Sequence, residues 1–361
     1  MSKHKTGFDY VPDGEFKSVI PEGSLKFASV GLDHGHIFAM SQGLINVGAE
    51  CKLVWDSDPK KVEDFLKRFP NTKAASSLEE VLADEEIKLI ANASVPADRF
   101  SYAKLALENG KHFFVDKPAF TSLEQLEEAE VLTEKYGKKL QVYFAERLHN
   151  EAAQKANMLI KEGRIGDVLQ VMILAPHRLS KAARPAWFFE KARYGGILCD
   201  IGTHQFEQFL EFGNCEKAHL NFARVDNLNN PETPELEDFG EVSITLANGV
   251  SCYCRVDWFT PEGLPVWGDG RTFILGTKGY IEIKKYIDIS KEDYPAQTLF
   301  LVDDNGVERM NCRGMNFSFF EEFALDIVNN TDKAMSQEHN FNASRLALEA
   351  QVQADKTRTK K

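Results

Sequence analysis

Apolar and polar positions along residues 25–144 follow two alternating periods. Short apolar runs of strand length are separated by segments in which apolar residues return every three or four positions, as on one face of a helix. Repeated strand–helix alternation predicts parallel strands joined by right-handed crossovers, and therefore a doubly wound sheet. The strand-like runs cover residues 25–30, 51–55, 87–93, 111–115 and 139–144, and the helix-like segments cover residues 37–47, 59–68, 99–109 and 121–136.

Two of the predicted helices begin with a capping-box pattern. Ser77 is followed by Glu80, and Thr121 by Glu124. A hydroxyl at the first position and a carboxylate three residues later satisfy the open backbone N–H groups of a helix start. We therefore expect helices to begin next to Ser77 and Thr121.

The pattern changes after residue 146. Alternating strand-like runs follow one another with few helices between them, and Asn248-Gly249 and Asn305-Gly306 separate neighbouring runs in the manner of hairpin turns. This half predicts a largely antiparallel sheet with helices on one face. The strand-like runs cover residues 168–174, 219–225, 240–246, 250–259, 272–275, 280–284 and 299–302, and the helix-like segments 151–161, 196–212, 315–328 and 343–354.

The chain of 361 residues is longer than a single core usually serves. We predict an α/β protein with an N-terminal Rossmann-type parallel sheet and a C-terminal α+β domain built on a large, open, mainly antiparallel sheet. The expected divisions are an N-terminal arm (1–24), a dinucleotide-binding domain (25–146), a substrate and oligomerisation domain (147–340), and a C-terminal helix with a basic tail (341–361).

Charge excludes two classes of partner. The formal net charge is −12, and so acidic a protein is repelled by nucleic acid and by anionic membrane surfaces. We interpret the one basic run, residues 356–361, as a solvated chain end. No apolar stretch has the length of a membrane span, and residues 1–23 lack the pattern of a secretory signal.

The six cysteines do not form a CxxC pair. Cys252 and Cys254 alternate along one predicted strand, so both face the same side of it. We interpret them as buried thiols and expect no metal site. Unpaired cysteines suit a reducing compartment, so we expect a cytoplasmic protein.

The turn after the first strand is the first candidate site. Its residues are Gly31, Asp33, His34, Gly35 and His36, with Leu32 between the first two. A dinucleotide turn requires glycine at its first, third and sixth positions, so that backbone N–H groups reach a diphosphate at a helix N-terminus. Only the first position fits, and Asp33 has an alternative role as a helix cap.

Asp56 lies at the end of the second strand, about 20–25 residues after the turn, where an acid receives the adenosine ribose hydroxyls. Asp58 adds negative charge nearby. A 2′-phosphate is disfavoured there, so we expect NAD rather than NADP; a plain turn aspartate before Pro59 is the alternative.

Two further motifs carry candidate catalytic groups. Asp116-Lys117-Pro118 follows a strand, and a lysine at the carboxyl end of a parallel sheet points into the ligand crevice, where it can stabilise an alkoxide. In the segment 195–204, a helix opened by Gly196 places Asp200 and His204 at i and i+4, on one face. A carboxylate beside a histidine orients the ring and adjusts its pKa, so the pair can accept a proton in alcohol oxidation.

These motifs together resemble the glucose–fructose oxidoreductase, inositol dehydrogenase and rhizopine-catabolism family (Gfo/Idh/MocA) over residues 25–354. Residues 106–112 with Asp116-Lys117-Pro118 are similar to its "ALxAGKH…EKP" stretch, residues 195–204 to its "GGxxxDxGxH" signature, and residues 267–280 to the "GDGR…GTxGY" strand pair of one branch. The chain departs from the family at Asp33, which replaces a glycine, and at Asp116, which replaces a glutamate.

The resemblance implies a Rossmann domain, an open sheet that often forms oligomer contacts, and sugars or cyclitols as substrates. It assigns catalysis to Lys117, Asp200 and His204. We expect the cofactor to contact Ser94, Pro96 and Lys117 besides the turn. Pro96 and Arg99 belong to the loop after strand 87–93, where the family often has Asn and His. Glu146-Arg147 stands near its frequent Asn-Arg.

Other polar and aromatic residues are candidates for the substrate side. An aromatic face with hydrogen-bonding groups around it suits a polyol, and a surface or packing role is the alternative for each. They are Arg147, His177, Arg178, Arg184, Trp187, Tyr194 and Asp269, besides Asp200 and His204.

The expected function is hydride transfer between a sugar or cyclitol CH–OH and NAD. Two alternatives stay open: a glycoside hydrolase or lyase that keeps NAD bound and oxidises its substrate transiently, and a non-catalytic ligand-sensing protein. We expect a homo-oligomer, a dimer or tetramer, formed through the C-terminal sheet.

Overall fold

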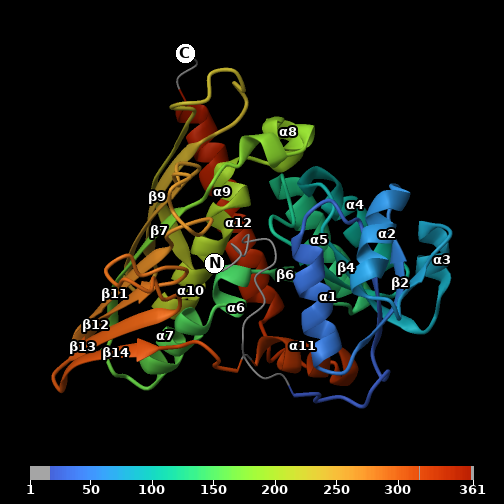
Figure 1. The fold of residues 1–361 in the computed structure, drawn as a ribbon, viewed down its shortest axis with the longest axis horizontal. Helices are drawn as coiled ribbons and strands as arrows, with labels where there is room; N and C mark the ends of the chain where they lie inside the picture. The colour runs from blue at the N-terminus through green and yellow to red at the C-terminus, as the bar shows by residue number, and fades with distance from the viewer. Residues whose placement is uncertain (1–16, 317, 359–361) are drawn as a thin grey trace.

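A computed structural model describes residues 17–316 and 318–358 (Figure 1). Most of the expected N-terminal arm and the last three residues of the basic tail lie outside these ranges.

The N-terminal half is the predicted doubly wound sheet. Six parallel strands lie in the order β3-β2-β1-β4-β5-β6. The strand order therefore reverses between β1 and β4, because β2 and β3 are added on one side of β1 and β4 to β6 on the other. Ligands bind at such a reversal, outside the carboxyl ends of the strands. The strands are β1 (Lys26–Val30), β2 (Glu50–Trp55), β3 (Lys73–Ala74), β4 (Ile87–Asn92), β5 (His112–Asp116) and β6 (Leu140–Tyr143), and the helices α1 (His36–Asn46), α2 (Pro59–Arg68), α3 (Leu78–Ala83), α4 (Pro96–Glu108) and α5 (Leu123–Tyr136).

Three local details differ from the sequence prediction. Strand β3 was not predicted, because two residues carry no periodic signal. Helix α5 is capped by Ser122, whose hydroxyl accepts from Gln125 N, so the capping box lies one residue later than expected. Helix α4 begins at Pro96 because proline suits a first turn, so Pro96 and Arg99 are helical and not in a loop.

The C-terminal half is the predicted open sheet. Its eight strands lie in the order β14-β13-β12-β11-β7-β10-β9-β8, and only β7 with β10 pair in parallel. Asn248-Gly249 and Asn305-Gly306 lie in the β9–β10 and β13–β14 hairpins, as predicted. The strands are β7 (Val168–Pro176), β8 (Ala218–Asp226), β9 (Phe239–Leu246), β10 (Ser251–Asp257), β11 (Arg271–Gly276), β12 (Gly279–Lys284), β13 (Thr298–Asp303) and β14 (Gly306–Asn311).

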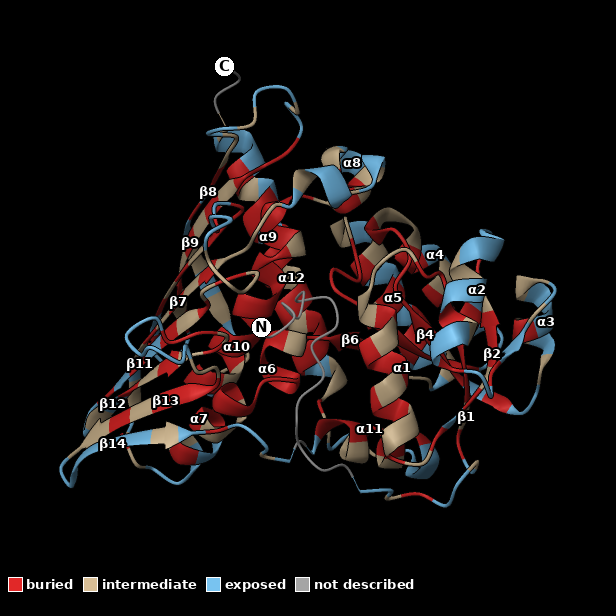
Figure 2. Cartoon of the chain, in the orientation of Figure 1, coloured by how far each residue is buried: buried red, intermediate tan, exposed pale blue. Residues whose placement is uncertain are grey.

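Helices cover one face of this sheet, and the other face is open (Figures 1 and 2). Cys252 and Cys254 are buried on the covered face, as expected. On the open face, Phe273, Leu275 and Tyr280 are 38–45% exposed. The helices of this half are α6 (Ala145–Leu148), α7 (Glu151–Lys161), α8 (Lys191–Tyr194), α9 (Ile197–Asp200), α10 (Gly202–Gly213), α11 (Phe319–Asn329) and α12 (Gln337–Thr357), with short 3-10 turns at Lys181–Ala183 and Ala186–Phe189.

The last two helices return to the N-terminal domain. Helix α11 packs against α1, where Gly43 leaves room for the ring of Phe320. Helix α12 runs from the open sheet to the edge strand β6. There the side chain of Gln337 bonds both N–H and C=O of Leu140, and Asn340 Oδ1 accepts from Val142 N at 2.8 Å. The edge of the parallel sheet is therefore closed by side chains of the C-terminal helix.

Among the described residues, no helix is both long and apolar enough to cross a membrane.

Candidate active site

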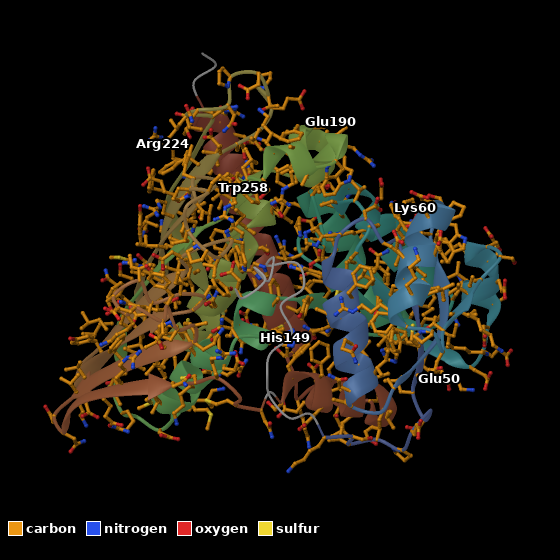
Figure 3. The ribbon with its side chains drawn as sticks, in the orientation of Figure 1. Glu50, Lys60, His149, Glu190, Arg224 and Trp258 are labelled. Atoms are coloured by element: carbon orange, nitrogen blue, oxygen red, sulfur yellow. The ribbon has the colours of Figure 1, made fainter. Side chains whose placement is uncertain are left out.

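A cavity lies where the carboxyl ends of the parallel strands face the open-sheet domain. His149, which follows α6, and Trp258, which follows β10, both line it and are labelled in Figure 3. The structure brings the following predicted residues together around it: His34, His36, Pro96, Lys117, His177, Arg178, Arg184, Trp187, Asp200 and His204.

Lys117 and Asp200 meet in this cavity although 83 residues separate them. Lys117 leaves the carboxyl end of β5, and its Nζ donates to Asp200 Oδ1 at 2.9 Å. Burial alone raises the pKa of Asp200, but the Lys117 ammonium outweighs it and leaves this pKa below its ordinary value. The aspartate is therefore ionised and holds the lysine in place.

His204 lines the same cavity and is almost completely buried. Burial holds its pKa well below the ordinary value, and the largest opposing effect is the Glu146 carboxylate. The ring is thus neutral and able to accept a proton. The predicted single helix is interrupted at Ile201: Asp200 ends α9, and His204 lies in the first turn of α10. In the described structure Asp200 hydrogen-bonds to Lys117 rather than to His204.

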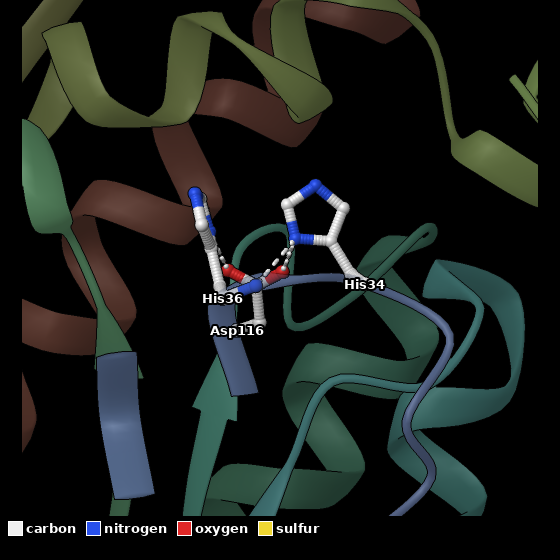
Figure 4. Close-up of side chains that lie close together, drawn as sticks. All are labelled: His34, His36 and Asp116. Atoms are coloured by element: carbon white, nitrogen blue, oxygen red, sulfur yellow. Dashed lines mark hydrogen bonds and ion pairs between the residues drawn. The ribbon is translucent and has the colours of Figure 1, made fainter. Parts of the chain in front are cut away.

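Two histidines of the first turn share one carboxylate (Figure 4). His36 Nδ1 lies 2.7 Å from Asp116 Oδ1, and His34 Nδ1 lies 3.0 Å from Oδ2. Asp116 also accepts from Arg99 at 3.0 Å and from Lys117 N at 2.8 Å. A carboxylate only accepts, so His36 Nδ1 donates to it. His34 Nδ1 also lies 3.3 Å from His36 N, which donates to it, and the Nε2 atoms of both rings lie on the side away from Asp116 (Figure 4).

His34, His36 and Asp116 also have the spacing of a metal-ligand set, with ligand atoms within 4.8 Å of one another. However, the Arg99 guanidinium lies against the same carboxylate and opposes a dication. We therefore interpret the cluster as a hydrogen-bonded unit.

The turn itself fits a diphosphate. Gly31 has φ +70°, and a Cβ there would lie 2.7 Å from Ser94 Cβ. Helix α1 has Gly35 at its N-cap and no acidic residue in its first turn, so no carboxylate of its own neutralises the positive end of its dipole. Its first N–H groups have acceptors within the turn: His36 N donates to His34 Nδ1 at 3.3 Å, and Ile37 N and Phe38 N donate to the carbonyl oxygens of His34 and Gly35 at 3.2 Å. Asp33 does not cap this helix; Lys61 holds its carboxylate at 2.6 Å.

Asp56 ends β2, but its carboxylate is buried. Oδ2 accepts from Leu32 N at 2.6 Å and Oδ1 from Asp58 N at 2.8 Å. It therefore ties the first turn to the start of α2, close to Lys61, whose Nζ is 3.6 Å away. Gly31, Asp33, Gly35, Asp56 and Ser94 are not among the residues that line the cavity.

The arginines near the cavity hold a loop. Arg178 donates to the carbonyl oxygens of Pro261 and Val266 at 2.9 and 3.0 Å. The Arg184 guanidinium stacks over Phe188, 4.4 Å from the ring centre, and donates to Leu179 O. These contacts shape the aromatic wall of the cavity, which includes Trp187, Trp258 and Trp267.

Three residues predicted at or near the substrate are not among the lining residues. Arg147 is buried and pairs with Glu207. Tyr194 donates its hydroxyl to Glu235 O, and Asp269 pairs with Arg271.

Comparison with known proteins identifies the chain. Residues 26–144 match the model of an oxidoreductase family with an NAD-binding Rossmann fold, and residues 153–282 match the GFO/IDH/MocA C-terminal domain. The chain belongs to the GFO/IDH/MocA oxidoreductase family.

A protein from Erwinia carotovora atroseptica whose crystal structure is described as that of an oxidoreductase is 44% identical, with a TM-score of 0.89 over 91% of this chain and 98% of that one. Levoglucosan dehydrogenase in complex with NADH and levoglucosan has the same fold at 18% identity, with a TM-score of 0.77 over 92% of this chain and 97% of that one. A scyllo-inositol 2-dehydrogenase (NADP⁺) from Bacillus subtilis is 24% identical over 44% of each chain.

In this GFO/IDH/MocA protein, the sequence analysis did not predict Glu146, His149 or Trp258 at the cavity. Glu146 carried one signal, since it stands near the family's frequent Asn-Arg. Trp258 and His149 reach the cavity only through tertiary packing, which no sequence spacing records.

Proposed function

We propose that this protein is an NAD-dependent dehydrogenase that transfers a hydride between a CH–OH group of a sugar or cyclitol and the nicotinamide. The observation that carries the proposal is the convergence of Lys117, Asp200 and His204 on one cavity, which His36 at the N-terminus of α1 also lines. Relatives named scyllo-inositol 2-dehydrogenase and D-xylose dehydrogenase support the substrate class.

A bound nicotinamide dinucleotide supplies the hydride acceptor. Lys117 donates a hydrogen bond to the substrate hydroxyl and stabilises the alkoxide character that develops as its proton leaves. His204, neutral through burial, takes that proton. Asp200 fixes the Lys117 ammonium, since the two are paired at 2.9 Å.

The Gly31 turn and the N-terminus of α1 would hold the cofactor diphosphate, because the positive end of the helix dipole favours an anion there and the first helical turn carries no carboxylate. We infer a preference for NAD because the carboxylates of Asp33, Asp56 and Asp58 surround a single ammonium, that of Lys61, near the expected ribose position. The net negative charge disfavours a 2′-phosphate.

The test is a panel of sugars and cyclitols with NAD or NADP, followed by NADH or NADPH absorbance. The proposal expects accumulation of free NADH with at least one neutral polyol. A substrate that is cleaved without net NADH would instead indicate the transient-oxidation chemistry, and ligand binding without any turnover would indicate a sensor.

We also infer that copies of the chain associate through the open face of the sheet, because Phe273, Leu275 and Tyr280 leave an apolar band there. Leu275→Asp should lower the mass measured by light scattering. Val131→Asp, on the exposed side of α5, is the matched control and should leave it unchanged. A cytoplasmic location is expected from the free cysteines and is tested by cell fractionation.

A further inference from the structure

We propose that Glu146 and His177 form a subsite that accepts hydrogen bonds from a second substrate hydroxyl and excludes substrates with a carboxylate at that position. The inference rests on the proposed dehydrogenase function and narrows its substrate class to neutral polyols. It starts from a buried carboxylate oxygen that has no donor.

Glu146 lines the cavity from α6 and is 5% exposed. Only one of its oxygens is satisfied: Oε2 accepts from Lys285 Nζ at 3.2 Å and from Gln205 Nε2 at 3.3 Å. Within the described part of the chain, Oε1 has no hydrogen-bond partner. A buried acceptor of this kind is costly unless a ligand or solvent supplies a donor.

His177 supplies a second acceptor beside it. Its Nδ1 lies 3.1 Å from Ala175 O, which can only accept, so Nδ1 carries the proton and Nε2 keeps a lone pair. That Nε2 lies 3.7 Å from Glu146 Oε1. Burial lowers the pKa of His177 to about 4, so no proton bridges the two atoms near neutral pH.

Two adjacent acceptors without a donor define what fits there. A hydroxyl about 2.8 Å from both atoms can donate to either of them. A carboxylate has no proton to offer and is repelled by the charge of Glu146. Because Lys285 already balances Glu146, the subsite does not require a cationic substrate.

The subsite lies beside the proposed base. The Glu146 carboxylate is the strongest opposing influence on the pKa of His204, and both residues line the same cavity. A hydroxyl held by Glu146 and His177 therefore belongs to the reacting end of the substrate. Aromatic contacts fix the His177 ring, since Trp267 lies 4.3 Å and Trp258 5.5 Å from its centre.

The decisive variant is Glu146→Gln, which keeps the shape and one acceptor for Lys285 but places an N–H₂ donor at the subsite. We expect KM for neutral sugars and cyclitols to rise about tenfold or more, because a hydrogen bond to a charged group is lost. KM for matched aldonic and uronic acids should fall, so the neutral-to-acid ratio of kcat/KM should drop by more than tenfold. If Glu146 had a purely structural role, Glu146→Gln would lower kcat/KM for neutral and acidic substrates by the same factor.

Glu241→Gln is the control, since Glu241 lies on the open face of the sheet and accepts a hydrogen bond from the Tyr253 hydroxyl there. The neutral-to-acid ratio of kcat/KM of this variant should match that of the wild type. If Glu146→Gln does not fold, Glu146→Gln with Lys285→Met removes both buried charges and serves the same measurement. An unchanged neutral-to-acid ratio, in a wild-type enzyme that oxidises polyols, overturns the subsite alone. Absence of turnover with every polyol in the wild type overturns the proposed function instead.

Discussion

Lowering the pH from 7 to 5 should destabilise this protein strongly, because burial keeps several histidines neutral. It lowers the pKa of His34, His112 and His177 to about 4 and that of His149 to about 3. In the unfolded chain these groups titrate near 6.5. The unfolded state therefore binds more protons below pH 6.5, and stability falls as the pH falls, until the folded imidazoles protonate near pH 4.

The magnitude follows from linkage. Each of these four histidines lowers the free energy of unfolding by about 2 kcal/mol when the pH falls from 7 to 5, and together they lower it by about 7 kcal/mol. His339 acts in the opposite direction: burial lowers its pKa, but hydrogen bonds to Glu207 and Glu216 outweigh burial and raise it to about 9. Its gain is only about 1 kcal/mol over the same interval. The net loss is at least about 6 kcal/mol, because the low pKa of His204 adds to it in the same direction. This is comparable to the whole stability of many domains.

Urea unfolding at pH 7, 6 and 5, followed by fluorescence of the four tryptophans, measures this loss. His112→Asn is a useful variant, since Asn can still accept from Lys139 N, which now bonds His112 Nδ1 at 3.0 Å. It should remove about a quarter of the pH dependence. A change in unfolding free energy below about 2 kcal/mol between pH 7 and 5 would refute the reasoning.

Three predictions concern the proposed chemistry. Lys117→Ala should lower kcat about a hundredfold or more while calorimetry finds NAD affinity nearly unchanged, because the ammonium acts on the substrate oxygen; a parallel loss of NAD affinity would assign it to the cofactor. His204→Asn should also lower kcat about a hundredfold or more with NAD affinity nearly unchanged, because the ring that takes the substrate proton is lost, and full activity in this variant would remove His204 from the role of base. Asp56→Ala should weaken NAD binding and bring the dissociation constants of NAD and NADP closer together, because it removes a negative charge and the hydrogen bond that holds Leu32 N. If the wild type binds NADP more tightly than NAD, the charge argument is contradicted.

The fold could be predicted from sequence because its signals are local. Alternating periods, the hairpin dipeptides and the Ser77 cap each act within a few residues, and they gave the parallel sheet and the mainly antiparallel sheet. The misplaced start of α5 has the same origin: Thr121 and Ser122 are adjacent hydroxyls with an acceptor three residues on, and only the observed geometry selects Ser122.

The details of the site depend on long-range pairing, which sequence does not record. The spacing of residues in the sequence can place Lys117 at the end of a strand, but it cannot show that four nitrogen atoms, those of His34, His36, Arg99 and the Lys117 backbone, converge on Asp116. Arg147 illustrates the converse. Its position suggested a substrate contact, yet its guanidinium is buried against Glu207 on α10, a partner 60 residues away.

The closure of strand β6 by the C-terminal helix has a consequence for the order in which the protein can be completed. The backbone groups of Leu140 and Val142 find their partners in Gln337 and Asn340, 197–200 residues later. During synthesis the parallel sheet is therefore available long before its outer strand is covered. Until then β6 presents unpaired N–H and C=O groups, the feature that recruits foreign strands. Helix α12 thus protects the nascent chain against aggregation through β6 only after a further 200 residues have been made.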